Sequence, residues 1–342
     1  MKRGFSLMVG LVVSGLLMFS VGCKKDDNGD DNGKDLSPRE RAIKDYEENY
    51  MGSRVTDAGW TGDVDGCNAG TISDDARAKV LQRLNYFRRL VGLSDNVTEN
   101  VSQHQGCQEA SLIFKAQNNL SHFPPQNWAC WTQAGYDAAA TGNIAWGTGT
   151  SGAFTVHTSY GVSGFIEDEG PHNTAVGHRA WFFMPGLTRL GIGSTNSTSC
   201  MQWKDNYTSS GPSPEFIAYP PAGYVPNQIA YPRWSFTLPG GANFTNANVT
   251  MTDDDGKNVT LTIVNNPAHQ PGSFPLRHLV WEPDINPLHF MNDRTFTVTI
   301  TGVVGAPKET YTYQTTIIPV TPSYRKPAPG DLGERIFMAI AQ

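Results

Sequence analysis

The chain has 342 residues, of which 39% are hydrophobic and 17% are charged, and its formal net charge is −6. This length is sufficient for two domains of modest size, and an aromatic content of 11% is typical of a packed extracellular protein. An acidic balance without any basic stripe argues against nucleic acid or an anionic surface as a partner.

Residues 1–23 have the pattern of an export signal. Two basic residues precede an apolar run that is too short for a comfortable membrane-spanning helix. The run ends in SVGC at 20–23, which resembles the lipobox of bacterial lipoproteins, although Ser20 stands where leucine is usual. In that family the cysteine is acylated and begins the mature chain. We therefore expect a lipid anchor at Cys23 and a place in the cell envelope, at the outer membrane or cell surface; a plain secretory signal is the alternative.

Residues 24–65 are expected to form an acidic tether and a lead-in to the fold. The first part, up to Asp35, contains no hydrophobic residue, so it cannot offset its own ordering entropy and should be disordered. An acidic run after the acylated cysteine also resembles the surface-export signals of some Bacteroidetes lipoproteins. A solvated spacer is an equally good interpretation.

Four cysteines remain after Cys23, and export would place them in an oxidising compartment. They are Cys67, Cys107, Cys130 and Cys200. An even number is compatible with two disulfides, and sequence does not choose among the three connectivities. Our preferred pair is Cys67 with Cys130. A four-cysteine zinc site is the rival, but it is disfavoured because the chain has no Cys-x-x-Cys pair.

Residues 66–210 are predicted to contain helices and then a mixture of helices and strands. Asp74 and Asp75 can cap a helix whose apolar residues recur at steps of four, three and four, and Gly92 ends it. A second helix is expected over about 99–117, ending before His122. A third helical stretch leads to the carboxylate run at 167–169. Strands are expected from 190 to 193 and from 200 to 203.

The last third of the chain changes to a period of two. A Pro-rich connector is expected at 211–232, followed at 233–320 by short alternating strands, with Asp255-Gly256 as a hairpin turn between two of them. This pattern predicts a small β-sandwich of immunoglobulin-like type. A tail at 321–342 ends in an apolar stretch that is expected either to dock as a short helix or to hang free.

Five short motifs follow one another in the middle of the chain. They are LNYFR at 84–88, LSH at 120–122, GNIA at 142–145, GHR at 177–179 and LGIG at 190–193. Their order resembles the bacterial branch of the CAP superfamily, the SCP-like family of cysteine-rich secretory proteins, antigen 5 and pathogenesis-related 1 proteins. The resemblance covers roughly residues 70–205. It implies an α+β protein in which a CAP-type α-β-α sandwich with a central cleft precedes the immunoglobulin-like β-sandwich.

The resemblance also implies a site in that cleft, made of two histidines and two acidic residues. The family histidines correspond to His122 and His178, and one family acid corresponds to Asp168, with Glu169 as the alternative one residue on. The other family acid is the glutamate of a Gly-Glu-Asn-Ile motif, and Gly142 replaces it here. The full set of four is therefore absent, which puts any activity that depends on that glutamate in doubt.

Two imidazoles and a carboxylate are ordinary ligands of zinc, with a fourth position left for water, so a divalent metal is the expected cofactor. Each residue also has a simpler interpretation. His122 can be a cation at a helix C-terminus, His178 a part of a packing turn, and the carboxylate run a solvated loop.

Three functions are compatible with these features. Our preferred hypothesis is a binding module, not an enzyme, whose cleft takes a metal ion and an apolar, peptide or envelope ligand. The second is a metal-dependent hydrolase of envelope or extracellular substrates, with Asp168 as base, although neither Gly-x-Ser-x-Gly nor His-Glu-x-x-His occurs. The third is a structural or adhesive surface protein that makes its contacts through the β-sandwich.

Overall fold

The computed structural model describes residues 35–148, 158–208, 211–265, 276–320 and 335–339. The chain divides into two units, residues 1–35 and residues 36–342, and all elements below belong to the second. The expected export signal, Cys23 and nearly all of the acidic tether lie outside the described residues. Across the described ranges, no helix combines the length and the apolar character needed to cross a membrane.

The lead-in to the fold is helical. Helix α1 (Pro38–Asp45) begins with a capping box, in which the Ser37 hydroxyl and the Glu40 carboxylate each accept a bond from the backbone of the other residue. A π-helical turn, η1 (Tyr46–Tyr50), and a 3₁₀ turn, η2 (Met51–Ser53), continue it. The Arg39 guanidinium pairs with Asp293 at 2.8 Å, so this segment is attached to the C-terminal part of the chain.

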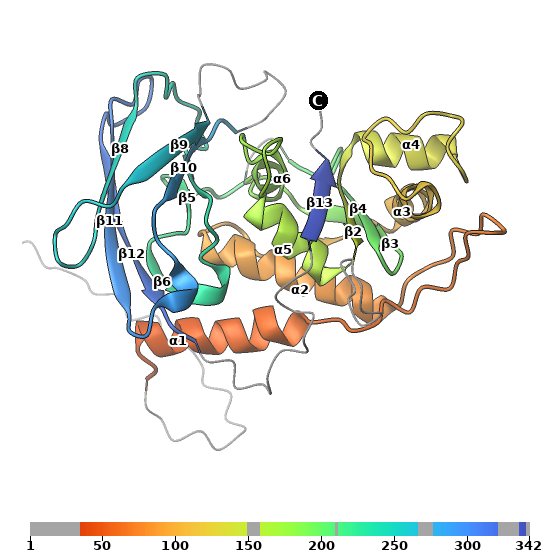
Figure 1. Cartoon of the computed structure of the whole chain (residues 1–342), viewed down its shortest axis with the longest axis horizontal. Coiled ribbons are helices and arrows are strands. Elements are labelled where there is room, and N and C mark those ends of the chain that lie inside the picture. The colour runs from red at the N-terminus through yellow and green to blue at the C-terminus, as the bar shows by residue number, and fades with distance from the viewer. Residues whose placement is uncertain (1–34, 149–157, 209–210, 266–275, 321–334, 340–342) are drawn as a thin grey trace, which may run out of the picture. The chain divides into compact units, whose positions relative to one another are not determined.

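A five-stranded sheet forms the first part of the fold, in the order β1-β3-β4-β2-β13. Figure 1 labels four of these strands, β3, β4, β2 and β13. Its strands are β1 (Thr98–Glu99), β2 (Gly142–Thr148), β3 (Arg189–Ser194), β4 (Thr198–Gln202) and β13 (Arg335–Ala339). All neighbours are antiparallel except β1 and β3. The strands expected near 190 and 200 are confirmed as β3 and β4. The expectation of a helical or free C-terminal stretch is wrong, because that stretch pairs with β2 as an edge strand.

Five helices accompany this sheet. They are α2 (Asp74–Leu90), α3 (His104–Gln117), α4 (Gln133–Ala140), α5 (Ser159–Glu167) and α6 (Gly177–Phe182). Helix α2 matches its prediction, although its cap is the Ser73 hydroxyl, which accepts from the backbone N–H of Ala76. Helix α3 begins five residues later than expected, because β1 pairs with β3 and a 3₁₀ turn, η3 (Val101–Gln103), intervenes.

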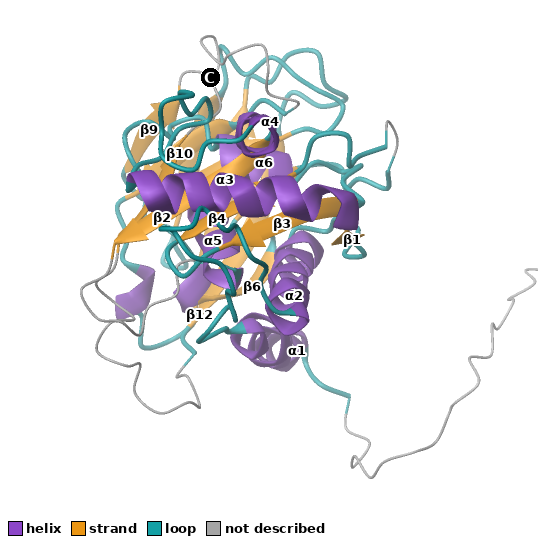
Figure 2. Cartoon of the chain, turned by 90° about the vertical axis from the view of Figure 1, so that its right-hand side faces the viewer, coloured by secondary structure: helices purple, strands orange, loops and turns teal. Residues whose placement is uncertain are grey.

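Helices pack on both faces of the sheet. Ile144 and Cys200 pack with residues of α3 and α4 in one buried cluster, whereas Ala145 and Met201 belong to a second cluster with residues of α2 and α5. Figure 2 shows α3 lying across the sheet. This close approach depends on Gly193 of β3, where a Cβ atom would collide with the backbone of α3.

Two four-stranded sheets make up the C-terminal part. One has the order β5-β7-β10-β9 and the other β6-β12-β11-β8. The first contains β5 (Ile217–Tyr219), β7 (Trp234–Thr237), β9 (Leu261–Asn265) and β10 (Leu279–Pro283). The second contains β6 (Gly223–Pro226), β8 (Asn248–Thr252), β11 (Arg294–Thr301) and β12 (Tyr311–Ile318). Short 3₁₀ turns, η4 (Asn227–Ile229) and η6 (Pro287–His289), lie in the connections.

These two sheets pack face to face through aromatic rings. Trp234 of β7 lies 6.2 Å from Phe296 of β11, centroid to centroid, and Phe236 lies 5.4 Å from Tyr311. The strands predicted from period two are present, and alternate burial holds in β8, β11 and most of β12, whereas β7 is buried throughout. Two details differ from expectation. The Pro-rich stretch expected as a connector contributes β5 and β6, and the turn at 255–256, which closes a short antiparallel hairpin through Thr252 and Asn258, leads on to β9 in the other sheet.

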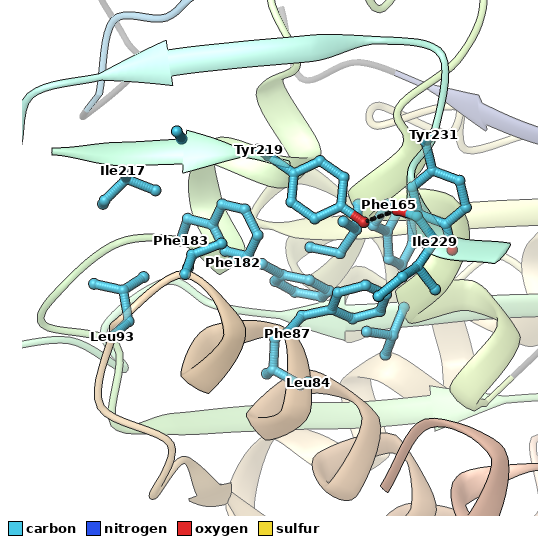
Figure 3. Packing of buried hydrophobic residues seen from close by; sticks show 14 of the residues in the cluster. Leu84, Phe87, Leu93, Phe165, Phe182, Phe183, Ile217, Tyr219, Ile229 and Tyr231 are labelled. Atoms are coloured by element: carbon cyan, nitrogen blue, oxygen red, sulfur yellow. Dashed lines mark hydrogen bonds between the residues drawn. The ribbon is translucent and has the colours of Figure 1, made fainter. Parts of the chain in front are cut away.

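One aromatic core continues from the helices into the second part of the fold. Figure 3 shows Phe87 of α2 and Phe183 beside Tyr219 of β5, with centroid distances of 6.3 and 6.0 Å. The Tyr219 hydroxyl donates a hydrogen bond to the carbonyl of Ile229 at 2.6 Å. The α+β fold class is thus established. Residues of the helices and of the C-terminal sheets belong to one buried cluster of side chains.

Candidate functional site

His178 is the second residue of α6, and the chain before it has an unusual backbone. Val176 has φ +48°, a conformation that is rare for a β-branched residue and persists only where the surroundings impose it. The carbonyl of His178 accepts a bond from the Asn143 amide at 3.0 Å, and the Asn143 oxygen accepts from the Trp203 indole at 3.1 Å. The backbone of His178 is therefore fixed from β2.

The Asp168 carboxylate contacts the His178 ring at its Nδ1 atom. Asp168 follows the last residue of α5 with φ +53°, and its N–H closes the helix by donating to the Gly164 carbonyl at 2.8 Å. The fully buried carboxylate accepts from His178 Nδ1 at 2.8 Å and from the backbone N–H of Arg179 at 3.2 Å. With Asp168 ionised, Nδ1 of His178 carries a proton, so a neutral ring has its lone pair on Nε2.

His122 approaches the same place from the loop after α3. Its Nδ1 donates to the carbonyl of Ala139 at 2.6 Å, which likewise leaves the lone pair of the neutral ring on Nε2. The rings of His122 and His178 are 6.5 Å apart and inclined by only 23°. The Phe165 ring lies 5.3 Å from His178 at a similar inclination. The two predicted histidines therefore come together from separate segments, with exposed fractions of 4% and 3%.

The other two carboxylates of the run lie elsewhere. Glu169 is exposed. The pKa of Glu167 is raised to about 7, mainly by burial and then by the Glu169 carboxylate, against the opposing effect of Arg179 and Arg233. Of the two predicted acids, Asp168 is the one that contacts a site histidine.

Gly142, where the CAP resemblance would place a glutamate, has no room for a side chain. A Cβ atom on Gly142 would lie 2.9 Å from the Met201 carbonyl oxygen and 3.1 Å from that of Ala138. Both obstacles are backbone atoms of well-packed elements, so neither can move aside cheaply. The packing of β2 against β4 and α4 thus requires glycine at position 142.

Two imidazoles form the donor set that a metal would meet. Within the described ranges, no three His, Cys, Asp or Glu side chains gather closely enough to hold a metal ion. Asp168 has both oxygens engaged, so it orients His178 and is not itself placed as a ligand. His122 and His178 would be the two protein ligands, and water or a ligand group would complete the coordination.

The preferred disulfide is confirmed. Cys67 and Cys130 are joined with an S–S distance of 2.07 Å. Cys107 and Cys200 are free thiols and fully buried, so of the four cysteines in the described ranges only Cys67 and Cys130 form a disulfide. Burial raises the pKa of the Cys200 thiol, which makes it unreactive.

Three kinds of contact around the site were not predicted from the sequence. Trp181 stacks on Trp203 at 3.4 Å and 9°, one turn along α6 from His178. Arg233, far along the chain, contacts the Asp168 loop. Asn143 lies inside a recognised motif, which was the only pointer to it.

Comparison of the chain with protein-family models, with curated proteins and with solved structures gives no match.

Proposed function

We propose that this chain is a lipid-anchored, extracytoplasmic CAP-type protein that acts as a binding module, with His122 and His178 as its divalent-metal ligands. The observation that carries the proposal is the convergence of the two histidine rings at 6.5 Å. Each ring is oriented through Nδ1 by a separate acceptor, an aspartate for one and a backbone carbonyl for the other. Metal-binding histidines have this arrangement, in which the outer partner fixes the tautomer and the ring direction.

A binding role is favoured over hydrolysis by the chemistry around the pair. Gly142 replaces the second family acid, and the packing there leaves no space for one. A metal held by two imidazoles would keep open positions for a ligand group from a peptide or an envelope component. The half-buried rings of Trp131 and Tyr136 and the exposed ring of Phe123 lie near His122 in sequence and in contact with one another, and they offer apolar surface for such a ligand.

Hydrolysis is the second candidate because the Asp168–His178 hydrogen bond is also the geometry of an oriented general base. In that case His178 would take the proton from a water, with Asp168 stabilising the imidazolium that forms.

Zinc titration calorimetry on the full chain tests the binding proposal. The wild-type protein is expected to bind one zinc ion, and His122→Ala/His178→Ala is expected to bind none. The matched control is His172→Ala/His289→Ala, which removes two exposed histidines and should leave binding intact. Absence of zinc binding by the wild-type protein, or equal loss in both double variants, would reject the site.

The anchor is tested separately by labelling cells that express the chain with radioactive palmitate. Label is expected in the membrane fraction with the wild-type chain and is expected to be lost in Cys23→Ser. An unlabelled protein released to the medium would favour the plain secretory signal.

A further inference from the structure

The loop that carries Asp168 is held by a residue of the β-sandwich part of the chain. Arg233, just before β7, directs one guanidinium nitrogen, Nη1, at three carbonyl oxygens of this loop. The distances are 2.8 Å to Asp168, 3.1 Å to Gly170 and 3.0 Å to Asn173. The other edge of the guanidinium pairs with the Glu282 carboxylate of β10, through Nε at 3.0 Å and Nη2 at 2.9 Å.

A second arginine, Arg179, connects the contact between Arg233 and the Asp168 loop to the start of α6, which carries His178. The backbone N–H of Arg179 donates to the Asp168 carboxylate, and its buried side chain donates to the carbonyls of Ile166 and Glu167 at 2.6 and 3.0 Å. The same side chain donates to the Ser235 hydroxyl at 2.9 Å and to the Arg233 carbonyl at 3.0 Å. The end of α5, the start of α6 and strand β7 thus meet in one network of buried hydrogen bonds.

This network stabilises the left-handed backbone conformation of Asp168. Asp168 has a left-handed φ, a conformation that costs a non-glycine residue free energy unless its surroundings hold it there. A buried guanidinium is itself costly unless all its donors are satisfied. The three loop carbonyls satisfy Arg233 and, in return, fix the direction in which the Asp168 side chain leaves the loop. Only a planar, five-donor group can serve the loop and Glu282 at the same time.

We propose that Arg233 is a positioning residue for the Asp168–His178 pair, so that the β-sandwich part completes the candidate site of the α-β-α part. This inference rests on the proposed function only in taking zinc as the probe ligand. The hydrogen bonds of the Arg233 guanidinium in the described part of the chain go to the Asp168 loop and Glu282 and to neither site histidine. Arg233 acts through Asp168, whose carboxylate determines which nitrogen of His178 carries the proton.

The test compares the full chain with its Arg233→Lys variant at pH 8. Lysine keeps the charge but cannot reach three carbonyls and a carboxylate together. Nitrogen-15 NMR of labelled histidine is expected to show the Nδ1–H tautomer of His178 in the wild-type protein and a shift toward Nε2–H in the variant. The zinc dissociation constant is expected to rise about tenfold, as for other outer partners of metal ligands.

Arg83→Lys is the matched control. Arg83 is also buried and donates to Ser53, Ser163 and the Tyr50 carbonyl, none of which belongs to the Asp168 loop. Arg83→Lys should lower the urea midpoint of unfolding while leaving the His178 tautomer unchanged. Glu282→Gln removes the ionic partner of Arg233 and leaves the arginine in place. It should shift the His178 tautomer in the same direction by a smaller amount. This variant replaces Arg233→Lys in the test if Arg233→Lys does not fold.

An unchanged tautomer in Arg233→Lys, or an equal shift in Arg83→Lys, would overturn the positioning role. The two proposals fail in different ways. A wild-type protein that binds no zinc removes the proposed function, whereas the tautomer comparison still decides the role of Arg233 in the metal-free protein.

Discussion

Replacement of Asp168 by asparagine perturbs the candidate site with the least change in shape. Asparagine adopts the left-handed backbone of this position as readily as aspartate does, so the loop itself should persist. The carboxylate is fully buried and accepts two donors, His178 Nδ1 and the Arg179 N–H. An asparagine side chain has only one acceptor oxygen, so its NH₂ group must face one of these two N–H groups.

In the folded variant the asparagine side chain can take either of two orientations, and each weakens the site. If the amide NH₂ faces Arg179, that buried N–H loses its acceptor, which costs about 1–3 kcal/mol of stability. If it faces His178, the ring must change tautomer, and the lone pair leaves Nε2. We expect Asp168→Asn to lower the free energy of unfolding by about 1–3 kcal/mol and to weaken zinc binding by roughly 10–100-fold.

Urea unfolding and zinc calorimetry on the same preparations measure the two effects. Glu169→Gln is the control, since it makes the same chemical change at the exposed neighbouring carboxylate and should alter both quantities little. Zinc binding of wild-type strength in Asp168→Asn would refute the view that this carboxylate orients the ring.

Three further outcomes follow from the packing. Gly142→Ala should lose about 1–3 kcal/mol of stability by overpacking against β4, whereas Gly240→Ala, with open space around it, should lose little; equal urea midpoints would contradict this. Because the pKa of Glu167 is raised to about 7 from 4.5, the folded state holds this proton more tightly, and stability falls as pH rises through that window. Glu167→Gln should therefore gain up to about 3 kcal/mol at pH 8 and almost nothing at pH 4, and a gain independent of pH would show that the carboxyl is not the cause. Cys67→Ser/Cys130→Ser, which opens a loop of 63 residues, should lose about 2–4 kcal/mol in urea unfolding, and an unchanged midpoint would mean that the bridge does not form.

Sequence patterns predicted the elements whose signals are local. Helix α2 follows from its apolar spacing, and β11 and β12 follow from strict alternation, because one face of each meets the core. Strand β10 has no such signal, because its sequence Leu-Val-Trp-Glu-Pro does not alternate between apolar and polar residues. The C-terminal strand β13 was missed because its pairing with β2 is a long-range contact.

The candidate site was predictable in its residue types but not in its connections. His122, His178 and Asp168 were selected from motif order, and the structure brings them together. The choice between adjacent carboxylates depends on the single left-handed residue that ends α5, which no periodicity reveals. Arg233 could not be found at all, since it lies 65 residues from the loop it holds.

The stacked indoles of Trp181 and Trp203 give this protein an intrinsic optical signal. Two stacked indoles in contact couple their excited states, and a twist between their transition moments produces a paired positive and negative band in circular dichroism. The pair is joined to the candidate site, because Trp203 bonds to Asn143 and Asn143 bonds to the His178 carbonyl. A ligand that moves the backbone of His178 would change the amplitude of this couplet, so occupancy can be followed by spectroscopy on the unlabelled protein.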